Sequence, residues 1–179
     1  MFHVTERLLL RPAWPEDAEA LFGGIADQKV VRNLARAPWP YLPEHARQFI
    51  AMEQDPRMPN FLLTRPGEHG SKVIGGAGLG EFEGGGELGY WIARPYWGQG
   101  FATEAARGVL EVARLLGHER VHGGHFTDNP ASGRVLRKLG FRPTGKTAPR
   151  HSCARGEKAD CMLYQLDLTQ VEGPTMQAA

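Results

Sequence analysis

The 179-residue sequence contains only two cysteines, Cys153 and Cys161, and its charges nearly cancel, with 21 lysines and arginines against 20 aspartates and glutamates. Two cysteines cannot make a disulfide framework, so we expect reduced thiols in a cytoplasmic protein. A net charge of +1 lacks the basic excess typical of a dedicated nucleic-acid-binding protein. Apolar runs near the N-terminus, such as Leu8–Leu10, are too short for a signal peptide or a membrane span. We therefore expect neither nucleic acid nor a membrane as a partner.

The remaining composition is ordinary for a globular protein, with 41% hydrophobic and 23% charged residues. A chain of this length can bury about 70% of its unfolded surface, so it needs neither a metal nor a disulfide to fold. We predict a single domain over residues 1–170. Residues 171–179 are predicted to be a flexible C-terminal tail, because the stretch from Glu172 to Ala179 is polar and small.

Hydrophobic spacing, glycines and prolines predict an alternation of strands and helices. The predicted strands are 7–12, 61–64, 72–82, 86–93, 120–126, 141–146 and 158–168. Helices are predicted from Pro15 through Ile25, from Pro43 to about Gln54, and over 100–116 and 131–139, with a basic loop from Arg150 to Arg155. This order indicates an α/β domain with a mixed sheet that ends in antiparallel strands.

The strand that ends near Ala93 is followed by a glycine-bearing loop, Gly98-Gln99-Gly100, and then at once by a helix. Unpaired N–H groups and the helix dipole make such a junction suited to a pyrophosphate, although a tight turn that binds nothing has the same spacing. Gly98 and Gly100 also fit the first two glycines of a dinucleotide fingerprint, whose third position falls on Thr103. A dinucleotide-binding oxidoreductase therefore stays an alternative.

Three blocks of sequence, in family order and spanning the chain to about Leu168, resemble the GNAT superfamily of N-acetyltransferases. They are similar to the branch that contains the ribosomal-protein N-terminal acetyltransferases. The blocks are Thr5-Glu6-Arg7-Leu8-Leu9-Leu10-Arg11-Pro12; Glu87-Leu88-Gly89-Tyr90-Trp91-Ile92 with Trp97-Gly98-Gln99-Gly100-Phe101-Ala102-Thr103-Glu104-Ala105; and Asn129 through Phe141.

The resemblance implies a GNAT-like fold: a mixed, mostly antiparallel sheet with helices on both faces and a splayed pair of parallel strands at the cofactor cleft. The cosubstrate is then acetyl-CoA, with no metal. Main-chain groups of Trp91, Ile92 and Ala93 are implied to bind the pantetheine arm, and one N–H there to polarise the thioester carbonyl. The implied pyrophosphate contacts come from Gly98, Gln99, Gly100, Phe101, Ala102 and Thr103. Asn129 and Ser132 match positions beside the arm and the sulfur.

Acetyl transfer to an amine needs the neutral amine, so a carboxylate near the acceptor can remove a proton. Glu87 matches the place where the superfamily often has this base, while Glu81 and Glu83 on the neighbouring strand stay open. Where the superfamily often has a tyrosine that protonates the leaving thiolate, this chain has Leu136. Ser132 is the best substitute as a hydrogen-bond donor to sulfur. The other alternative is that no dedicated acid is needed, because a thiol with a free pKa near 8.5 can leave as the thiolate.

We predict an N-acetyltransferase that moves an acetyl group to a primary amine, on a small molecule or a protein N-terminus, by direct attack in a ternary complex. The alternative is a non-catalytic CoA-binding or interaction domain of the same fold. His122 and His125 point to opposite faces of a strand and do not favour a metal site. The identity of the acceptor and the question of a homodimer stay open.

Overall fold

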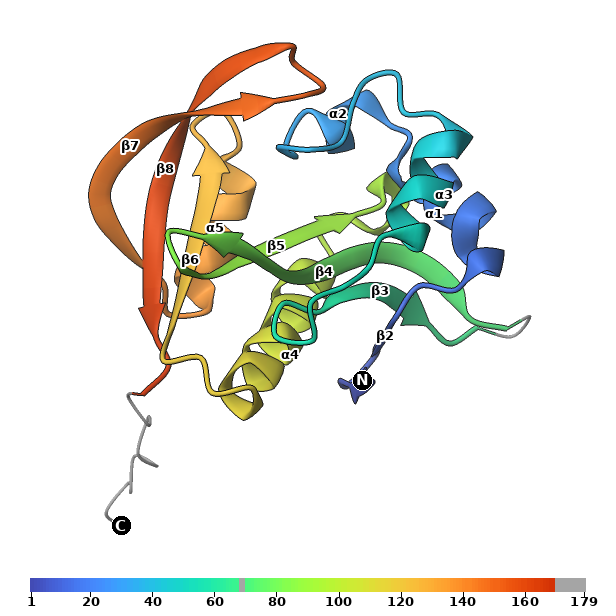
Figure 1. Ribbon diagram of the computed structural model, residues 1–179, viewed down its shortest axis with the longest axis horizontal. Coiled ribbons are helices and arrows are strands. Elements are labelled where there is room, and N and C mark those ends of the chain that lie inside the picture. The colour runs from blue at the N-terminus through green and yellow to red at the C-terminus, as the bar shows by residue number, and fades with distance from the viewer. Residues whose placement is uncertain (68–69, 170–179) are drawn as a thin grey trace.

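The computed structural model describes residues 1–67 and 70–169 and contains one sheet of eight strands flanked by helices (Figure 1). The strands are β1 (His3–Val4), β2 (Leu9–Arg11), β3 (Asn60–Arg65), β4 (Lys72–Phe82), β5 (Gly85–Ile92), β6 (Arg120–Phe126), β7 (Arg142–Ser152) and β8 (Glu157–Asp167). The helices are α1 (Ala18–Ile25), α2 (Gln28–Val31), α3 (Pro43–Ala51), α4 (Phe101–Leu115) and α5 (Pro130–Lys138), with 3₁₀ turns at Pro15–Asp17 and Arg94–Tyr96. The predicted tail at 171–179 lies outside the described residues.

The sheet has the strand order β1-β2-β3-β4-β5-β6-β8-β7, and β5 and β6 are its parallel pair, the other neighbours being antiparallel. The mixed, mostly antiparallel sheet predicted above is therefore confirmed. The β4–β5 hairpin turns at Glu83 and Gly84, whose φ angles are 49° and 75°. Positive φ is inexpensive only for glycine, so Gly84 permits this tight turn.

Each face of the sheet has its own hydrophobic core. On the α4 face, which α4 and α5 cover, Ala105, Val109 and Val112 of α4 are fully buried against strand residues such as Leu63 and Ile74. On the α1 face, covered by α1, α2 and α3, a second core is formed by Leu21, Ile25, Val30, Val31, Tyr41, Ala46 and Leu62. Because β3 is buried on both faces, its sequence is a continuous apolar run rather than an alternating pattern.

The N-terminal segment fixes the start of α4. Thr5 Oγ1 and the Arg7 main-chain N–H donate to Glu104 Oε1 at 2.6 and 2.7 Å, and Arg7 Nε donates to Glu104 Oε2 at 2.7 Å. Burial of Glu104 opposes its ionisation, but the hydrogen bonds from Thr5 and Arg7 hold its pKa below the usual value. The first sequence block therefore has a structural role, because it anchors the first turn of α4 and, through Arg7 Nη1 and Gln99 O, the loop before it.

The predicted basic loop from Arg150 to Arg155 is wrong. Strand β7 continues through Ser152, and the turn of the β7–β8 hairpin lies at 153–156, with Gly156 at a φ of 71°. Most β7 side chains are exposed and polar, so the sequence lacks the apolar alternation that marks a strand. The strand is held by pairing with β8, which a local pattern does not reveal.

None of the helices within residues 1–67 and 70–169 is long and apolar enough to cross a membrane.

Candidate functional site

A cleft opens where the parallel strands β5 and β6 separate. Their pairing covers only Gly86–Leu88 and Val121–Gly123, and beyond it a cleft of about 610 Å³ lies between the diverging strands. Side chains from both faces of the sheet line it, with Tyr90 and Ser132 from the α4 face and Trp91 from the α1 face. A ligand in this cleft can therefore reach from one face of the sheet to the other.

One wall of the cleft is the N-terminus of α4. Gly98 and Gly100 have φ angles of 75° and 83°, and Gly100 caps the helix, so the first N–H groups of α4 have no partners within the helix. Gly98, Gly100, Phe101, Ala102 and Thr103 line the cleft. On α5, Arg134 and Lys138 lie one turn apart along the same cleft and add positive charge. Together these groups form a wall suited to an anion, which we call the anion-binding wall.

The direction of the β5 main chain bears on the predicted contacts of Trp91, Ile92 and Ala93. The Ala93 N–H donates to Ile74 O of β4 at 2.8 Å and the Ala93 carbonyl accepts from Tyr96 N, and Ala93 is buried and does not line the cleft. Along an antiparallel ladder, main-chain groups alternate in direction, so Trp91 also faces β4 with its N–H and C=O. Tyr90 and Ile92 face the cleft instead, and the Ile92 carbonyl accepts from Trp97 Nε1 at 2.6 Å.

Gln99 is the second predicted residue that the structure places outside the cleft lining. Its side-chain amide donates to Pro95 O at 3.1 Å, and its carbonyl accepts from Arg7 Nη1 at 3.1 Å. It therefore stabilises the loop instead of facing the cleft. Of the three candidate bases, Glu87 lines the cleft, while Glu81 is exposed on β4 and Glu83 lies in the hairpin turn.

Two polar side chains at the start of α5, Asn129 and Ser132, and one on β5, Tyr90, line the cleft. Asn129 caps the helix, its Oδ1 accepting from the Ser132 N–H at 3.4 Å. The Ser132 hydroxyl lies 2.8 Å from the Tyr90 hydroxyl, which also donates to the Ser132 carbonyl at 3.2 Å. Burial raises the pKa of Tyr90 to about 12, although the hydrogen bond with Ser132 opposes the shift. Leu136 lies one turn further along α5, is buried in the core and offers no polar group.

An ion pair stands on the α1-face side of the cleft. Arg150 of β7 donates to Glu87 Oε1 at 2.6 Å, and its guanidinium stacks on the Phe82 ring at 4.2 Å. Cys161 of β8 lines the cleft beside them, and burial raises the pKa of its thiol, with Glu87 adding to the shift and Arg150 opposing it. Sequence reasoning missed Arg150 as a site residue, because it assigned this arginine to a loop.

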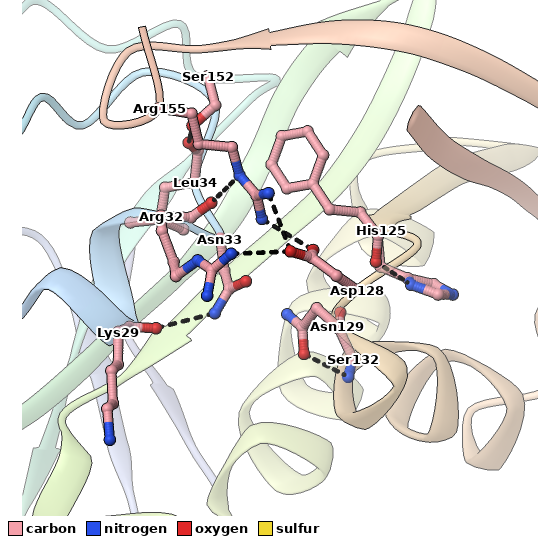
Figure 2. A network of polar contacts seen from close by, with 11 residues as sticks. Lys29, Arg32, Asn33, Leu34, His125, Asp128, Asn129, Ser132, Ser152 and Arg155 are labelled. Atoms are coloured by element: carbon pink, nitrogen blue, oxygen red, sulfur yellow. Dashed lines mark hydrogen bonds and ion pairs between the residues drawn. The ribbon is translucent and has the colours of Figure 1, made fainter. Parts of the chain in front are cut away.

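The tip of the β7–β8 hairpin is bound to the segment that follows α2, and Figure 2 shows the contacts. Asp128 accepts two hydrogen bonds from Arg155, at 2.9 and 2.8 Å, and one from Arg32 at 2.9 Å. The Arg155 Nε also donates to Arg32 O, and Ser152 Oγ donates to Leu34 O. The hydrogen bonds from Arg155 lower the pKa of Asp128 despite partial burial, and the charge of Arg32 lowers it further. We call this set of contacts, centred on Asp128, the hairpin clamp.

The three histidines on and just before β6, His118, His122 and His125, each have a different partner. His125 is buried, and its Nδ1 pairs with Phe126 O at 2.8 Å, while His122 packs against Phe82 and His118 Nε2 pairs with Arg57 O. Across residues 1–67 and 70–169, no group of three or more histidine, cysteine, aspartate or glutamate side chains is placed to hold a metal ion.

Comparison with known proteins places this geometry in a family context. A family model for the acetyltransferase (GNAT) domain matches residues 7–142. The uncharacterized N-acetyltransferase YoaA of Bacillus subtilis (strain 168) is 31% identical over 169 residues, which cover 90% of this chain and 94% of YoaA. A GNAT-family acetyltransferase from Bacillus anthracis superposes with a TM-score of 0.81 at 24% identity, over 95% of this chain and 100% of that one. RimL, a ribosomal-protein α-N-acetyltransferase solved with coenzyme A, superposes with a TM-score of 0.77 at 19% identity, over 93% and 98% of the two chains.

Proposed function

This chain belongs to the acetyltransferase (GNAT) family and is an acyl-CoA-dependent acetyltransferase, and from this premise we propose that it transfers the acetyl group of acetyl-CoA to a primary amine by direct attack in a ternary complex. The observation that carries the proposal is the cleft between β5 and β6. The cleft extends from the N-terminus of α4, which suits an anion, to the Glu87 carboxylate. Acetyl-CoA can therefore enter from the α4 side and the amine from the Glu87 side, and the two can meet within the cleft.

The cleft has the groups that acetyl-CoA requires. The N–H groups of Gly98 and of Gly100 through Thr103 suit the pyrophosphate, and the side chains of Arg134 and Lys138 suit its charge. The main-chain groups of Tyr90 and Ile92 that face β6 suit the amides of the pantetheine arm, with one N–H directed at the thioester carbonyl. Asn129 adds a side-chain amide beside the arm. The complex of RimL with coenzyme A supports this choice of ligand, since RimL has the same fold.

The residues on the α1-face side suit the proton chemistry. An α-amino group has a pKa of about 7.7–8.0 and a lysine amine about 10.4, so the acceptor arrives mainly protonated at neutral pH. Glu87 takes the first proton from the ammonium group, directly or through a water molecule, and passes it to solvent, while Arg150 holds the Glu87 carboxylate in place through Oε1. The neutral amine nitrogen then bonds to the carbonyl carbon, and the nitrogen loses its second proton by the same route to Glu87. The C–S bond breaks, and its electron pair goes to sulfur, where Ser132 donates a hydrogen bond.

The acceptor is a primary amine, on a small molecule or at a protein N-terminus. On the α1-face side of the cleft the charges of Glu87 and Arg150 cancel. This ion pair therefore presents no net negative charge that would favour a polycation as the acceptor. We further propose that residues 1–170 act as one catalytic domain, because both cores share one sheet. A cytoplasmic location suits the two free thiols, Cys153 and Cys161.

Two measurements test this function. Thermal unfolding with acetyl-CoA, CoA and NAD compares the ligands directly, and a ligand at a hundred times its Kd adds about 2.7 kcal/mol, or roughly 5–10 °C in Tm for this size. We expect both CoA species to raise Tm and NAD to leave it unchanged. Thiol release from acetyl-CoA with a panel of amines, amino acids and N-terminal peptides then identifies the acceptor class. A Tm raised by NAD alone, or CoA binding with no amine acetylated, contradicts the proposal.

A further inference from the structure

Two hydroxyl groups meet in the cleft where α5 approaches β5. Tyr90 lies on the α4 face of β5, and its hydroxyl contacts both the Oγ and the main-chain carbonyl of Ser132, at 2.8 and 3.2 Å. Both residues line the cleft. The Tyr90 phenol is therefore in contact with the group that donates to sulfur in the proposed function, although Tyr90 has no role there through its side chain.

A serine hydroxyl needs such a neighbour to be an effective donor. Serine has one hydrogen and rotates freely, so an isolated Ser132 spends part of its time with that hydrogen on another acceptor. The phenol of Tyr90 has one hydrogen and two acceptors within reach on Ser132. When Tyr90 donates to Ser132 Oγ, the Ser132 hydrogen is released for a third group in the cleft. When Tyr90 donates to the Ser132 carbonyl, the Ser132 hydrogen is taken by the Tyr90 oxygen.

We propose that Tyr90 is a positioning residue, which donates its hydroxyl hydrogen to Ser132 Oγ and so directs the Ser132 hydrogen at the sulfur of the leaving thiolate. This inference rests on the proposed function, since it assigns Ser132 to the sulfur. As the C–S bond breaks and negative charge grows on sulfur, the two hydroxyls rotate in series. Each O–H bond stays intact, because only hydrogen-bond partners change.

The acidity of Tyr90 explains why it orients the serine and does not itself give up a proton. With its pKa raised to about 12, the phenol stays protonated throughout the neutral range, so it remains a donor. Transfer of its proton to a thiolate, whose free pKa is near 8.5, runs uphill. A pair of hydrogen bonds stabilises the charge on sulfur without that transfer.

A double-mutant cycle tests the coupling between the two hydroxyls, with Tyr90→Phe, Ser132→Ala and the double variant. We expect Tyr90→Phe to lower kcat about tenfold, the size expected for one hydrogen bond, while the KM for acetyl-CoA is unchanged. In the Ser132→Ala background, Tyr90→Phe has no further effect on kcat. Equal losses in both backgrounds, or an unchanged kcat in Tyr90→Phe, overturn the inference. The control is Tyr41→Phe, which removes another buried phenol hydroxyl outside the cleft and leaves kcat unchanged.

A second measurement needs no acceptor, so it separates this inference from the proposed function. The Kd of CoA and of a CoA analogue without sulfur are compared from pH 7 to 9 in the wild type and the variants. We expect CoA to bind more tightly than the analogue as its thiol ionises, and Tyr90→Phe and Ser132→Ala to abolish that gain. A Tyr90→Phe profile equal to the wild type overturns the role of Tyr90. If the wild type acetylates none of the amines, the proposed function is contradicted, but the role of Tyr90 in binding the CoA thiolate is not.

Discussion

At the scale of single residues, Glu87 is the side chain on which the proposed proton transfer depends. It lines the cleft with one oxygen held by Arg150, whereas Glu81 lies on the neighbouring strand with its side chain exposed. We expect Glu87→Gln to lower kcat by 10²- to 10⁴-fold, the usual contribution of a general base, and to leave the Kd of CoA unchanged. Glu81→Gln is the matched control and is expected to keep wild-type kcat. Steady-state kinetics from pH 6 to 9 with calorimetry decide between them, and full turnover in Glu87→Gln excludes this base.

The two cysteines differ in environment, which gives a second residue-scale prediction. Cys153 is exposed in the hairpin turn, while Cys161 is buried in the cleft and burial raises its pKa. Because the thiolate is the reactive form, we expect iodoacetamide at pH 8 to label Cys153 at least tenfold faster. We also expect CoA to slow the labelling of Cys161 further. Peptide mass spectrometry, with Cys153→Ser to isolate the slow site, measures both rates. Equal rates at the two cysteines contradict the buried position of Cys161.

Gly98 is predicted from a glycine-bearing loop before a helix, and Glu87 and Ser132 from the resemblance to the GNAT superfamily; all three line the cleft. Arg150 and the Tyr90 hydroxyl could not be predicted. Arg150 reaches Glu87 only because β7 pairs with β8 and β8 pairs with β6, a register set over three strands. Tyr90 meets Ser132 only because α5 packs against the α4 face. Contacts between segments far apart in sequence carry no local signal.

At the scale of elements, α1, α3, α4 and α5 are predicted within a few residues because their amphipathic spacing is local, whereas the short helix α2 (Gln28–Val31) is not predicted. Helix α4, expected over 100–116, spans Phe101–Leu115. The direction of main-chain groups along β5 could not be predicted in this way. The same sequence allows either the odd-numbered or the even-numbered residues to direct their N–H and C=O groups at β4. The bond from Ala93 N–H to Ile74 O decides between them: the main-chain groups of Trp91 and Ala93 point toward β4, and those of Tyr90 and Ile92 point away from β4.

Helix α4 allows the anion-binding wall to be tested with a control on the same element. Gly98, before the helix, and Gly117, after it, have φ angles of 75° and 80°, and a Cβ added at either meets no atom within 4 Å. We expect Gly98→Ala and Gly117→Ala to cost about 1–2 kcal/mol of stability each, since both force alanine into the left-handed region. Only Gly98→Ala is expected to weaken CoA binding, because only Gly98 lines the cleft. Urea unfolding and calorimetry measure the two quantities. Equal CoA affinity in both variants contradicts the assignment of this loop to the phosphates.

At the scale of the whole molecule, the cleft depends on contacts between distant parts of the chain. The hairpin clamp connects the β7–β8 tip, the segment after α2 and the turn before α5, and Figure 1 shows the hairpin reaching across toward α2. Cys153 N–H donates to Ala35 O at 2.9 Å and strengthens this closure. Since Asp128 immediately precedes Asn129, the clamp also connects the β7–β8 hairpin tip to the cap of α5.

The clamp predicts that acceptor binding depends on Arg155, whose side chain is only 13% exposed and also stacks on Phe126. We expect Arg155→Ala to raise the KM of the acceptor several-fold and the hydrogen-exchange rate of residues 150–157, with the KM of acetyl-CoA unchanged. Arg47→Ala, which removes an exposed ion pair with Glu44, is the matched control and should change neither the acceptor KM nor the exchange rate.

The pH dependence of the clamp follows from Asp128. Because the pKa of Asp128 is lowered in the fold, its stabilising pairing is fully present above the unfolded pKa near 3.8 and is lost as pH falls through the folded pKa. The difference in exchange between the wild type and Arg155→Ala should therefore persist from pH 5 to 9, and a difference that disappears within that range excludes an ionic clamp at Asp128.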